Sequence, residues 1–263
     1  MMKPDYYSKF TDSLTQRLSL DTRVEGLVAL GSMAARDYQP DQFSDHDFFV
    51  ITRPGEQEPF RSDLNWLPEA DRIVLSYRET AHGLKVLYDT PHLLEFAIFD
   101  REELNLARIN RYRVLLDRGG IATAMEALHE RTTAQVRDGN GASNAFHVGQ
   151  VLTILYVGVC RYRRGECLSG HQFVKVSSLY HLLPLVTRLV PAERVTLLDN
   201  LDPFRRFDLV YPELGAELRS AFLLPVPEAA AALLALLERE IQPRLNDFPS
   251  TAVEAVRRFL RES

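Results

Sequence analysis

Cysteine is scarce in this chain, and the spacing of the few that occur excludes two common roles. The sequence of 263 residues holds two cysteines, Cys160 and Cys167. On one helix they would lie two turns apart, about 10 Å along the axis, which is too far for a disulfide. Neither belongs to a Cys-x-x-Cys pair, so a zinc site is not expected either. We therefore expect two reduced thiols, as is usual in a cytosolic protein.

Clustered positive charge and long apolar runs are also missing. Lysine and arginine total 31 against 36 aspartates and glutamates, the formal net charge is -5, and no run of five basic residues occurs. Binding to a nucleic-acid backbone requires clustered positive charge, so we expect no nucleic-acid partner. The first residues are too polar for a signal peptide, and no apolar run approaches the length of a membrane span. We expect a cytoplasmic protein with no membrane partner.

The chain does contain enough apolar sequence for a sizeable core, in one large domain or two smaller ones. Apolar residues make up 46% and charged residues 25%, as in globular proteins. A helical stripe over residues 4–19 precedes short β-type runs, which predict strands at 24–30, 46–52, 72–78, 84–89 and 92–100. After residue 120 the apolar period is helical, over 121–132, 144–164, 170–189, 191–199, 212–222, 227–243 and 250–262. This pattern predicts an α+β protein, with a mixed-sheet domain over residues 1–120 and an all-helical domain over residues 121–263.

Residues 27–52 carry the pattern most relevant to function. One β-type run ends in Gly31-Ser32, and the next opens with Asp45-His46-Asp47. Side chains alternate along a strand, so Asp45 and Asp47 point to the same side and repel each other unless a cation lies between them. Carboxylate oxygens suit Mg²⁺, which keeps positions open for phosphate oxygens. Glycine allows close approach to a ligand, and a strand-to-helix turn presents N–H groups to phosphate. The segment predicts a magnesium site at Asp45 and Asp47 beside a phosphate-binding turn at Gly31 and Ser32.

The order Gly31-Ser32, a short intervening stretch, and then Ser44-Asp45-x-Asp47 resembles the polymerase-β-like nucleotidyltransferases. Within that superfamily the chain is most similar to the antibiotic nucleotidyltransferases of the lincosamide and aminoglycoside type. The sequence departs from the family at Ala35-Arg36, where an arginine is often followed by glycine. The resemblance extends to further segments: Asn65-Trp66-Leu67, residues 82–100 and, more loosely, residues 161–170 and 199–209.

The resemblance implies a third carboxylate on a neighbouring strand, and Glu95 in HLLEFAIFD is the candidate. A glutamate between Leu94 and Phe96 is costly to bury unless it is paired or lies near a metal. Glu95 is either a third metal ligand or a general base that takes the proton from an attacking hydroxyl. Asp89 and Asp100 are alternatives, but both stand at strand ends, where acids commonly just terminate the run.

Other polar residues have two readings each. His46 lies between the two aspartates and is expected to face the other way, in the core or behind the site. Lys175 follows His171 at helical spacing and would reach the triphosphate in the family's cleft, or it is a surface lysine. Three arginines cap a helix end or bind phosphate: Arg161, Arg163 and Arg164.

The resemblance implies a function for each domain. Residues 1–120 would be the nucleotidyltransferase catalytic domain, and residues 121–263 the helical acceptor-binding domain. The expected reaction is Mg²⁺-dependent transfer of a nucleoside monophosphate, AMP from ATP, to a hydroxyl of a small molecule such as an aminoglycoside or lincosamide antibiotic. Asp45, Asp47 and Glu95 would be catalytic, with Gly31, Ser32 and Lys175 binding the nucleotide. Two alternatives remain open, a non-catalytic nucleotide-binding regulatory module and an enzyme that nucleotidylates a protein, and a homodimer is as open as a monomer.

Overall fold

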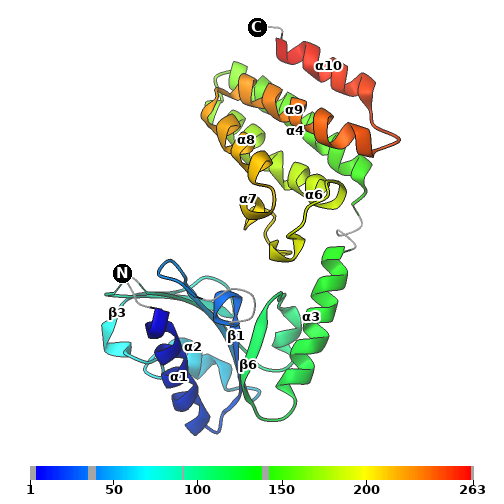
Figure 1. Ribbon diagram of the computed structural model, residues 1–263. Helices are drawn as coiled ribbons and strands as arrows, with labels where there is room; N and C mark the ends of the chain where they lie inside the picture. Colours follow the sequence, from blue (N-terminus) through cyan, green and yellow to red (C-terminus); the bar gives the residue numbers. More distant parts are fainter. Residues whose placement is uncertain (1–3, 35–39, 91, 138–141, 262–263) are drawn as a thin grey trace. The chain divides into compact units, whose positions relative to one another are not determined.

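The computed structural model describes residues 4–34, 40–90, 92–137 and 142–261, so Ala35-Arg36 lies outside the described residues. The chain divides into two compact units, Met1–Gln135 and Val136–Ser263. The first holds a mixed sheet with helices and the second is helical, which confirms the predicted α+β class (Figure 1). The division falls later than the expected boundary at residue 120, because helix α3 (Ile121–Arg137) belongs to the first unit and buries Ile121 and Met125 against the sheet.

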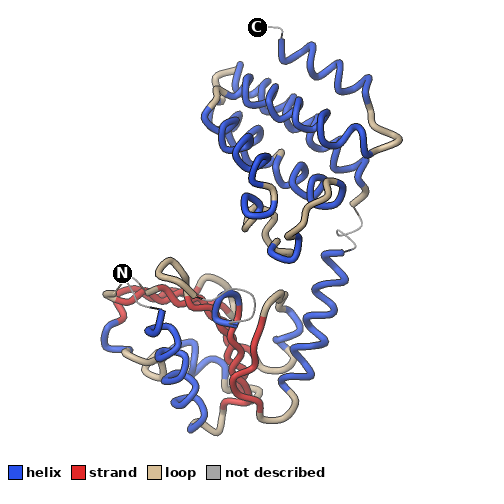
Figure 2. Tube along the Cα trace, viewed as in Figure 1, coloured by secondary structure: helices blue, strands red, loops and turns tan. Residues whose placement is uncertain are grey.

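The first unit is built on one six-stranded sheet, drawn in red in Figure 2. Its strands run in the order β3-β4-β5-β2-β1-β6, and only β2 and β5 pair in parallel. Strand β6, with the sequence YRVLLD, lies on the sheet edge and was not predicted from the sequence. The bounds are β1 (Val24–Leu30), β2 (His46–Thr52), β3 (Ile73–Arg78), β4 (Gly83–Tyr88), β5 (Leu93–Phe99) and β6 (Tyr112–Asp117).

Helices cover both faces of this sheet, as the alternation of side chains along the strands requires. One face packs with α1 (Pro4–Leu20) and α2 (Gln57–Ser62), where Phe48 and Val50 of β2 are buried. The other face packs with α3, where Ile51 of β2 is buried. The described part of the unit also has three short 3₁₀ turns: η1 (Gly31–Ala34), η2 (Ala70–Arg72) and η3 (Glu103–Leu106).

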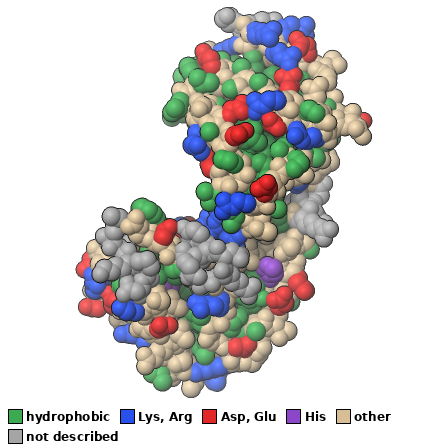
Figure 3. Space-filling model, in the orientation of Figure 1, with side chains coloured by type: hydrophobic (Ala, Val, Ile, Leu, Met, Phe, Trp, Pro, Cys, Tyr) green, Lys and Arg blue, Asp and Glu red, His purple; other side chains and the backbone are tan. Residues whose placement is uncertain are grey.

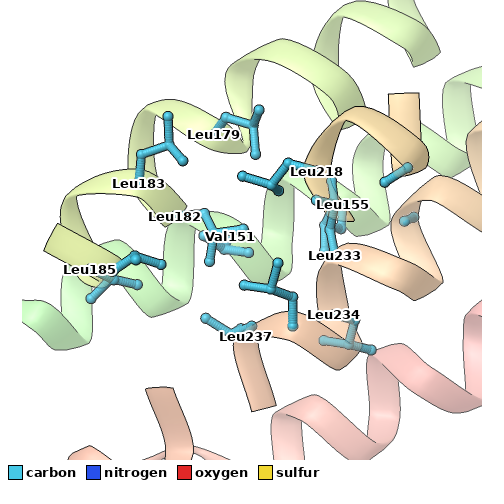
Figure 4. Packing of buried hydrophobic residues seen from close by; sticks show 14 of the residues in the cluster. Val151, Leu155, Leu179, Leu182, Leu183, Leu185, Leu218, Leu233, Leu234 and Leu237 are labelled. Carbon is cyan, nitrogen blue, oxygen red and sulfur yellow. The ribbon is translucent and has the colours of Figure 1, made fainter. Parts of the chain in front are cut away.

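The second unit has a core of its own, made chiefly of leucine and valine (Figure 4). The expected helix at 170–189 is divided into α5, a π-helical turn and α6, and Pro184 lies inside α6. The expected helix at 191–199 was wrong, because only a 3₁₀ turn at Val195–Leu197 forms there. The bounds are α4 (Asn144–Arg163), α5 (Cys167–Gln172), η5 (Phe173–Ser177), α6 (Leu179–Leu189), η6 (Val195–Leu197), α7 (Phe207–Val210), α8 (Pro212–Leu223), α9 (Val226–Ile241), η7 (Gln242–Arg244) and α10 (Ser250–Arg261).

Both cysteines are free thiols, Cys160 in α4 and Cys167 in α5, with Gly165 at a φ of +86° in the turn between the two helices. On the face shown in Figure 3, acidic and basic side chains are interspersed over each unit. None of the described helices combines the length and the apolar character that crossing a membrane requires.

Candidate metal centre

Three carboxylates meet on one face of the sheet in the first unit. Asp45 directly precedes β2 and Asp47 is its second residue, so the two lie on the same side. Strand β5 runs parallel to β2 with Glu95 opposite Asp47. One ligand oxygen from each of the three lies within 4.8 Å of the others, and each residue is half-buried. Within the described part of the chain, no other group of three or more acidic, histidine or cysteine side chains is this close.

The donor set fits a hard divalent cation. Three carboxylates so close together repel one another, and a cation between them removes that repulsion. All the donors are oxygens, as Mg²⁺ prefers, and a Mg²⁺ ion held by these residues would keep positions open for phosphate oxygens. His46 does not contribute a metal ligand here. The residue is 1% exposed and lies on the opposite face, where its Nε2 is 3.2 Å from the Thr11 hydroxyl oxygen. This agrees with the expectation that His46 faces away from the two aspartates.

Gly31 brings the chain close to this carboxylate group. Its φ is +52°, which favours glycine, and a Cβ built there would lie 2.9 Å from Oδ2 of Asp47. Its N–H donates to the carbonyl of Arg111 at 3.2 Å, which ties the turn to the chain just before β6. Any side chain at Gly31 would therefore press on the Asp47 carboxylate.

Ser32 follows Gly31 in the η1 turn and carries a buried hydroxyl. The residue is 6% exposed, and its Oγ has no hydrogen-bond partner among the residues that the structure describes. Burying a hydroxyl without a partner is costly, so an acceptor supplied by a ligand would stabilise it. The structure thus brings Gly31 next to Asp47 and puts a hydroxyl donor at the next position.

The other acids weighed from the sequence have structural partners away from the group. Asp89 forms an ion pair with Arg72 at 2.9 Å. Asp100 accepts from the Gln57 side-chain amide at 2.6 Å and from the backbone N–H groups that open η3. Glu95 is therefore the one of the three candidates that joins Asp45 and Asp47.

Lys175 and the arginines belong to the helical unit, where their side chains bind the protein itself. Lys175 Nζ donates to the carbonyls of Phe222 at 2.8 Å and Leu224 at 2.5 Å, at the end of α8. Arg161 contacts Ser169 Oγ and the Phe173 ring. Arg163 donates to the carbonyls of Phe259 and Leu260, and Arg164 pairs with Glu166. Nucleotide binding by Lys175 stays a prediction.

Two cations near the site were not identified from the sequence. Lys85 of β4 lies opposite Glu95, with Nζ 3.1 Å from Glu95 Oε1 and 3.0 Å from Glu79 Oε1. The hydrogen-bonded carboxylates of Glu79 and Glu95 raise the pKa of Lys85, so its ammonium is charged at neutral pH. The sequence held a signal for Lys85: in Leu84-Lys85-Val86 a lysine lies between two apolar residues, and both of these are buried in the structure.

Arg113 of β6 is the second of these cations. Its Nη2 donates to the carbonyl of Met33 at 3.3 Å, so the exposed guanidinium lies against the η1 turn that contains Gly31 and Ser32. Because β6 itself was not predicted as a strand, nothing in the sequence connected Arg113 to this turn. A guanidinium has five N–H donors, so one bond to a carbonyl leaves others for an anion.

Behind the carboxylates, on the face that packs with α1, lies a buried layer of aromatic and histidine rings. Burial and the neighbouring His92 lower the pKa of His46 to about 3. Burial lowers the pKa of His92 to about 4, and its Nδ1 lies 3.4 Å from the Tyr6 hydroxyl oxygen. Both rings are therefore neutral at physiological pH, and they add no positive charge beneath the three carboxylates.

Among the comparisons with known proteins, the comparison with solved structures gives matches. No protein-family model matches the sequence, and no curated protein matches it either. Among solved structures, the chain is similar to that of an aminoglycoside 6-adenyltransferase from Bacillus subtilis, with 10% identity and a TM-score of 0.37 over 97% of this chain and 97% of that chain. By its name that protein is an adenyltransferase.

Proposed function

We propose that this protein is a magnesium-dependent nucleotidyltransferase that moves a nucleoside monophosphate, AMP from ATP, onto a hydroxyl of a small molecule. One observation carries the proposal: Asp45, Asp47 and Glu95 offer oxygens within 4.8 Å of one another beside a glycine turn that closely approaches Asp47. Carboxylates that hold a divalent cation, beside a turn with space for phosphates, would support metal-assisted transfer of a nucleotidyl group.

The residues around the carboxylate group would bind the metal and the phosphates. Asp45 and Asp47 hold Mg²⁺, which neutralises phosphate charge when bound. Gly31 leaves space for the phosphates, and the Ser32 hydroxyl donates a hydrogen bond to them. The Arg113 guanidinium adds positive charge at the same turn.

Glu95 acts at the acceptor. The acceptor hydroxyl oxygen forms a bond to the α-phosphorus, and the bond from that phosphorus to the pyrophosphate oxygen breaks. Glu95 takes the hydroxyl proton, or binds the metal as a third ligand while water takes the proton. Positioning of the two substrates in line supplies most of the rate.

From the family resemblance we assign acceptor binding to the helical unit and triphosphate binding to Lys175, whose Nζ would then exchange its bonds to the Phe222 and Leu224 carbonyls for bonds to phosphate oxygens. An aminoglycoside or a lincosamide is the acceptor class that the sequence resemblance suggests, which would make drug resistance the biological role.

The direct test combines Mg²⁺, each labelled nucleoside triphosphate and a panel of aminoglycosides and lincosamides, with pyrophosphate release as the readout. We expect release that depends on both an acceptor and Mg²⁺, and none from the Asp45→Asn/Asp47→Asn variant with an unchanged circular dichroism spectrum. Equal turnover by that folded variant would refute the metal assignment. Label found on a polypeptide would identify a protein-modifying enzyme, and nucleotide binding without any transfer would identify a regulatory module.

A further inference from the structure

Four side chains form a row across neighbouring strands on the site face of the sheet. The strand registers pair Asp47 with Glu95, Glu95 with Lys85, and Lys85 with Tyr77. Lys85 is the cation of this row, and its side chain is 23% exposed. The strand register fixes this order, so the position of Lys85 next to Glu95 follows from the pairing of β4 with β5.

Lys85 forms an ion pair with Glu95, the carboxylate that β5 contributes to the group of three. Its Nζ lies 3.1 Å from Oε1 of Glu95 and 3.0 Å from Oε1 of Glu79. One Glu95 oxygen therefore already has a cationic partner without any metal. A divalent cation that approaches Asp45, Asp47 and Glu95 meets the repulsion of this ammonium and competes with it for Glu95.

We propose that Lys85 is a positioning residue, a built-in counter-ion that holds Glu95 and keeps the three carboxylates from closing tightly on a divalent cation alone. The inference rests on the proposed function. Its consequence is that the metal binds well only together with the triphosphate, whose negative charge outweighs the ammonium. Lys85 would thus couple metal binding to nucleotide binding at the same site.

The experiment measures Mn²⁺ binding to the whole protein without nucleotide, by electron paramagnetic resonance and calorimetry. Removing one positive charge beside three carboxylates is expected to tighten Mn²⁺ binding by about 3- to 30-fold in Lys85→Met. Lys85→Arg, which keeps the charge, should remain close to the wild type. Arg72→Met is the matched control, because it removes a cation of the same unit that pairs with Asp89 and Glu69 instead of Glu95.

A second measurement separates coupling from simple affinity. Mn²⁺ affinity is measured with and without ATP, and the affinity with ATP is divided by the affinity without it. In Lys85→Met this ratio should fall by the same factor by which the affinity for Mn²⁺ without ATP rises. Lys85→Gln, a polar replacement, serves if Lys85→Met is shown by its melting curve to be unfolded.

The outcomes distinguish the inference from the function. If the wild type binds Mn²⁺ and transfers nucleotide, but folded Lys85→Met and Lys85→Gln bind Mn²⁺ no more tightly, the role of Lys85 is wrong and the enzyme assignment stands. If neither the wild type nor any variant binds Mn²⁺ with or without ATP, the proposed metal site is wrong and the inference fails with it.

Discussion

At the scale of single residues, Glu95 decides between the two chemical readings of the site. Glu95→Gln keeps the shape but removes the charge that takes a proton or binds metal. If Glu95 is a general base, the substitution should lower turnover by about 10²–10⁴-fold at every Mg²⁺ concentration. If Glu95 is a metal ligand, raising the Mg²⁺ concentration should partly restore turnover. Steady-state kinetics across a magnesium titration make the distinction, and near-normal turnover at ordinary magnesium would mean that another carboxylate does this work.

The Gly31-Ser32 turn makes a second prediction at this scale. Gly31→Ala should strongly weaken binding of ATP–Mg²⁺, because its Cβ would lie 2.9 Å from Asp47 Oδ2 at a φ of +52°. Ser32→Ala should cost less, about 1 kcal/mol of binding free energy if one hydrogen bond is lost. Calorimetry with ATP–Mg²⁺ measures both. Gly55→Ala is the control, since Gly55 shares a positive φ of +85° but has open space around its Cβ position. Unchanged affinity in both test variants would show that the turn does not bind phosphate.

At the scale of elements, the packing of α1 on the sheet should depend on pH through His46 and His92. Their pKa values, about 3 and about 4, lie below the ordinary value of 6.5. A depressed histidine pKa means that the unfolded chain binds the proton first, so stability is full above pH 6.5 and falls as the pH drops toward 4. Each histidine contributes a slope of about 1.4 kcal/mol per pH unit within that window.

Urea unfolding at pH 7, 6 and 5 tests this expectation. His92→Phe removes one titrating group from the buried layer, so its free energy of unfolding should fall less steeply between pH 6.5 and 5 than that of the wild type. The same loss of stability in both proteins would show that His92 is solvated or charged in the folded state.

At the scale of the whole molecule, the carboxylates of the candidate metal site and the helical core of the C-terminal part belong to different units. Asp45, Asp47, Glu95 and Gly31 all lie in Met1–Gln135, and the helical unit has its own core. A fragment of residues 1–137, which ends with α3, should therefore keep the Mn²⁺ affinity of the full chain while transferring no nucleotide to an acceptor. Electron paramagnetic resonance of bound Mn²⁺ measures the first property, and pyrophosphate release the second.

The helical fragment of residues 142–263 is the control for that comparison. It should show a helical circular dichroism spectrum with a cooperative melt, because its buried leucines and valines pack with one another. It should bind no Mn²⁺ at concentrations that saturate the full chain. A sheet fragment that folds without binding Mn²⁺ would place an essential ligand outside residues 1–137.

Local sequence determined those features that depend on spacing along one element. Strand alternation put Asp45 and Asp47 on one side and His46 on the other, because successive side chains of a strand face opposite ways. Helical period likewise predicted residues 4–19 and 250–262, close to α1 (Pro4–Leu20) and α10 (Ser250–Arg261). Both follow from backbone geometry within a few residues, so they are visible without the tertiary structure.

Pairing between distant segments decided the rest. Glu95 came from the family resemblance, and only the parallel register of β2 and β5 brings it opposite Asp47. Lys85 reaches Glu95 through the register of β4, and Arg113 reaches the η1 turn through edge strand β6. A strand's own residues do not specify which strand it pairs with or in what register, because that choice depends on burial and turns across the whole sheet. Only the assembled sheet therefore places Lys85 next to Glu95 and Arg113 next to the η1 turn.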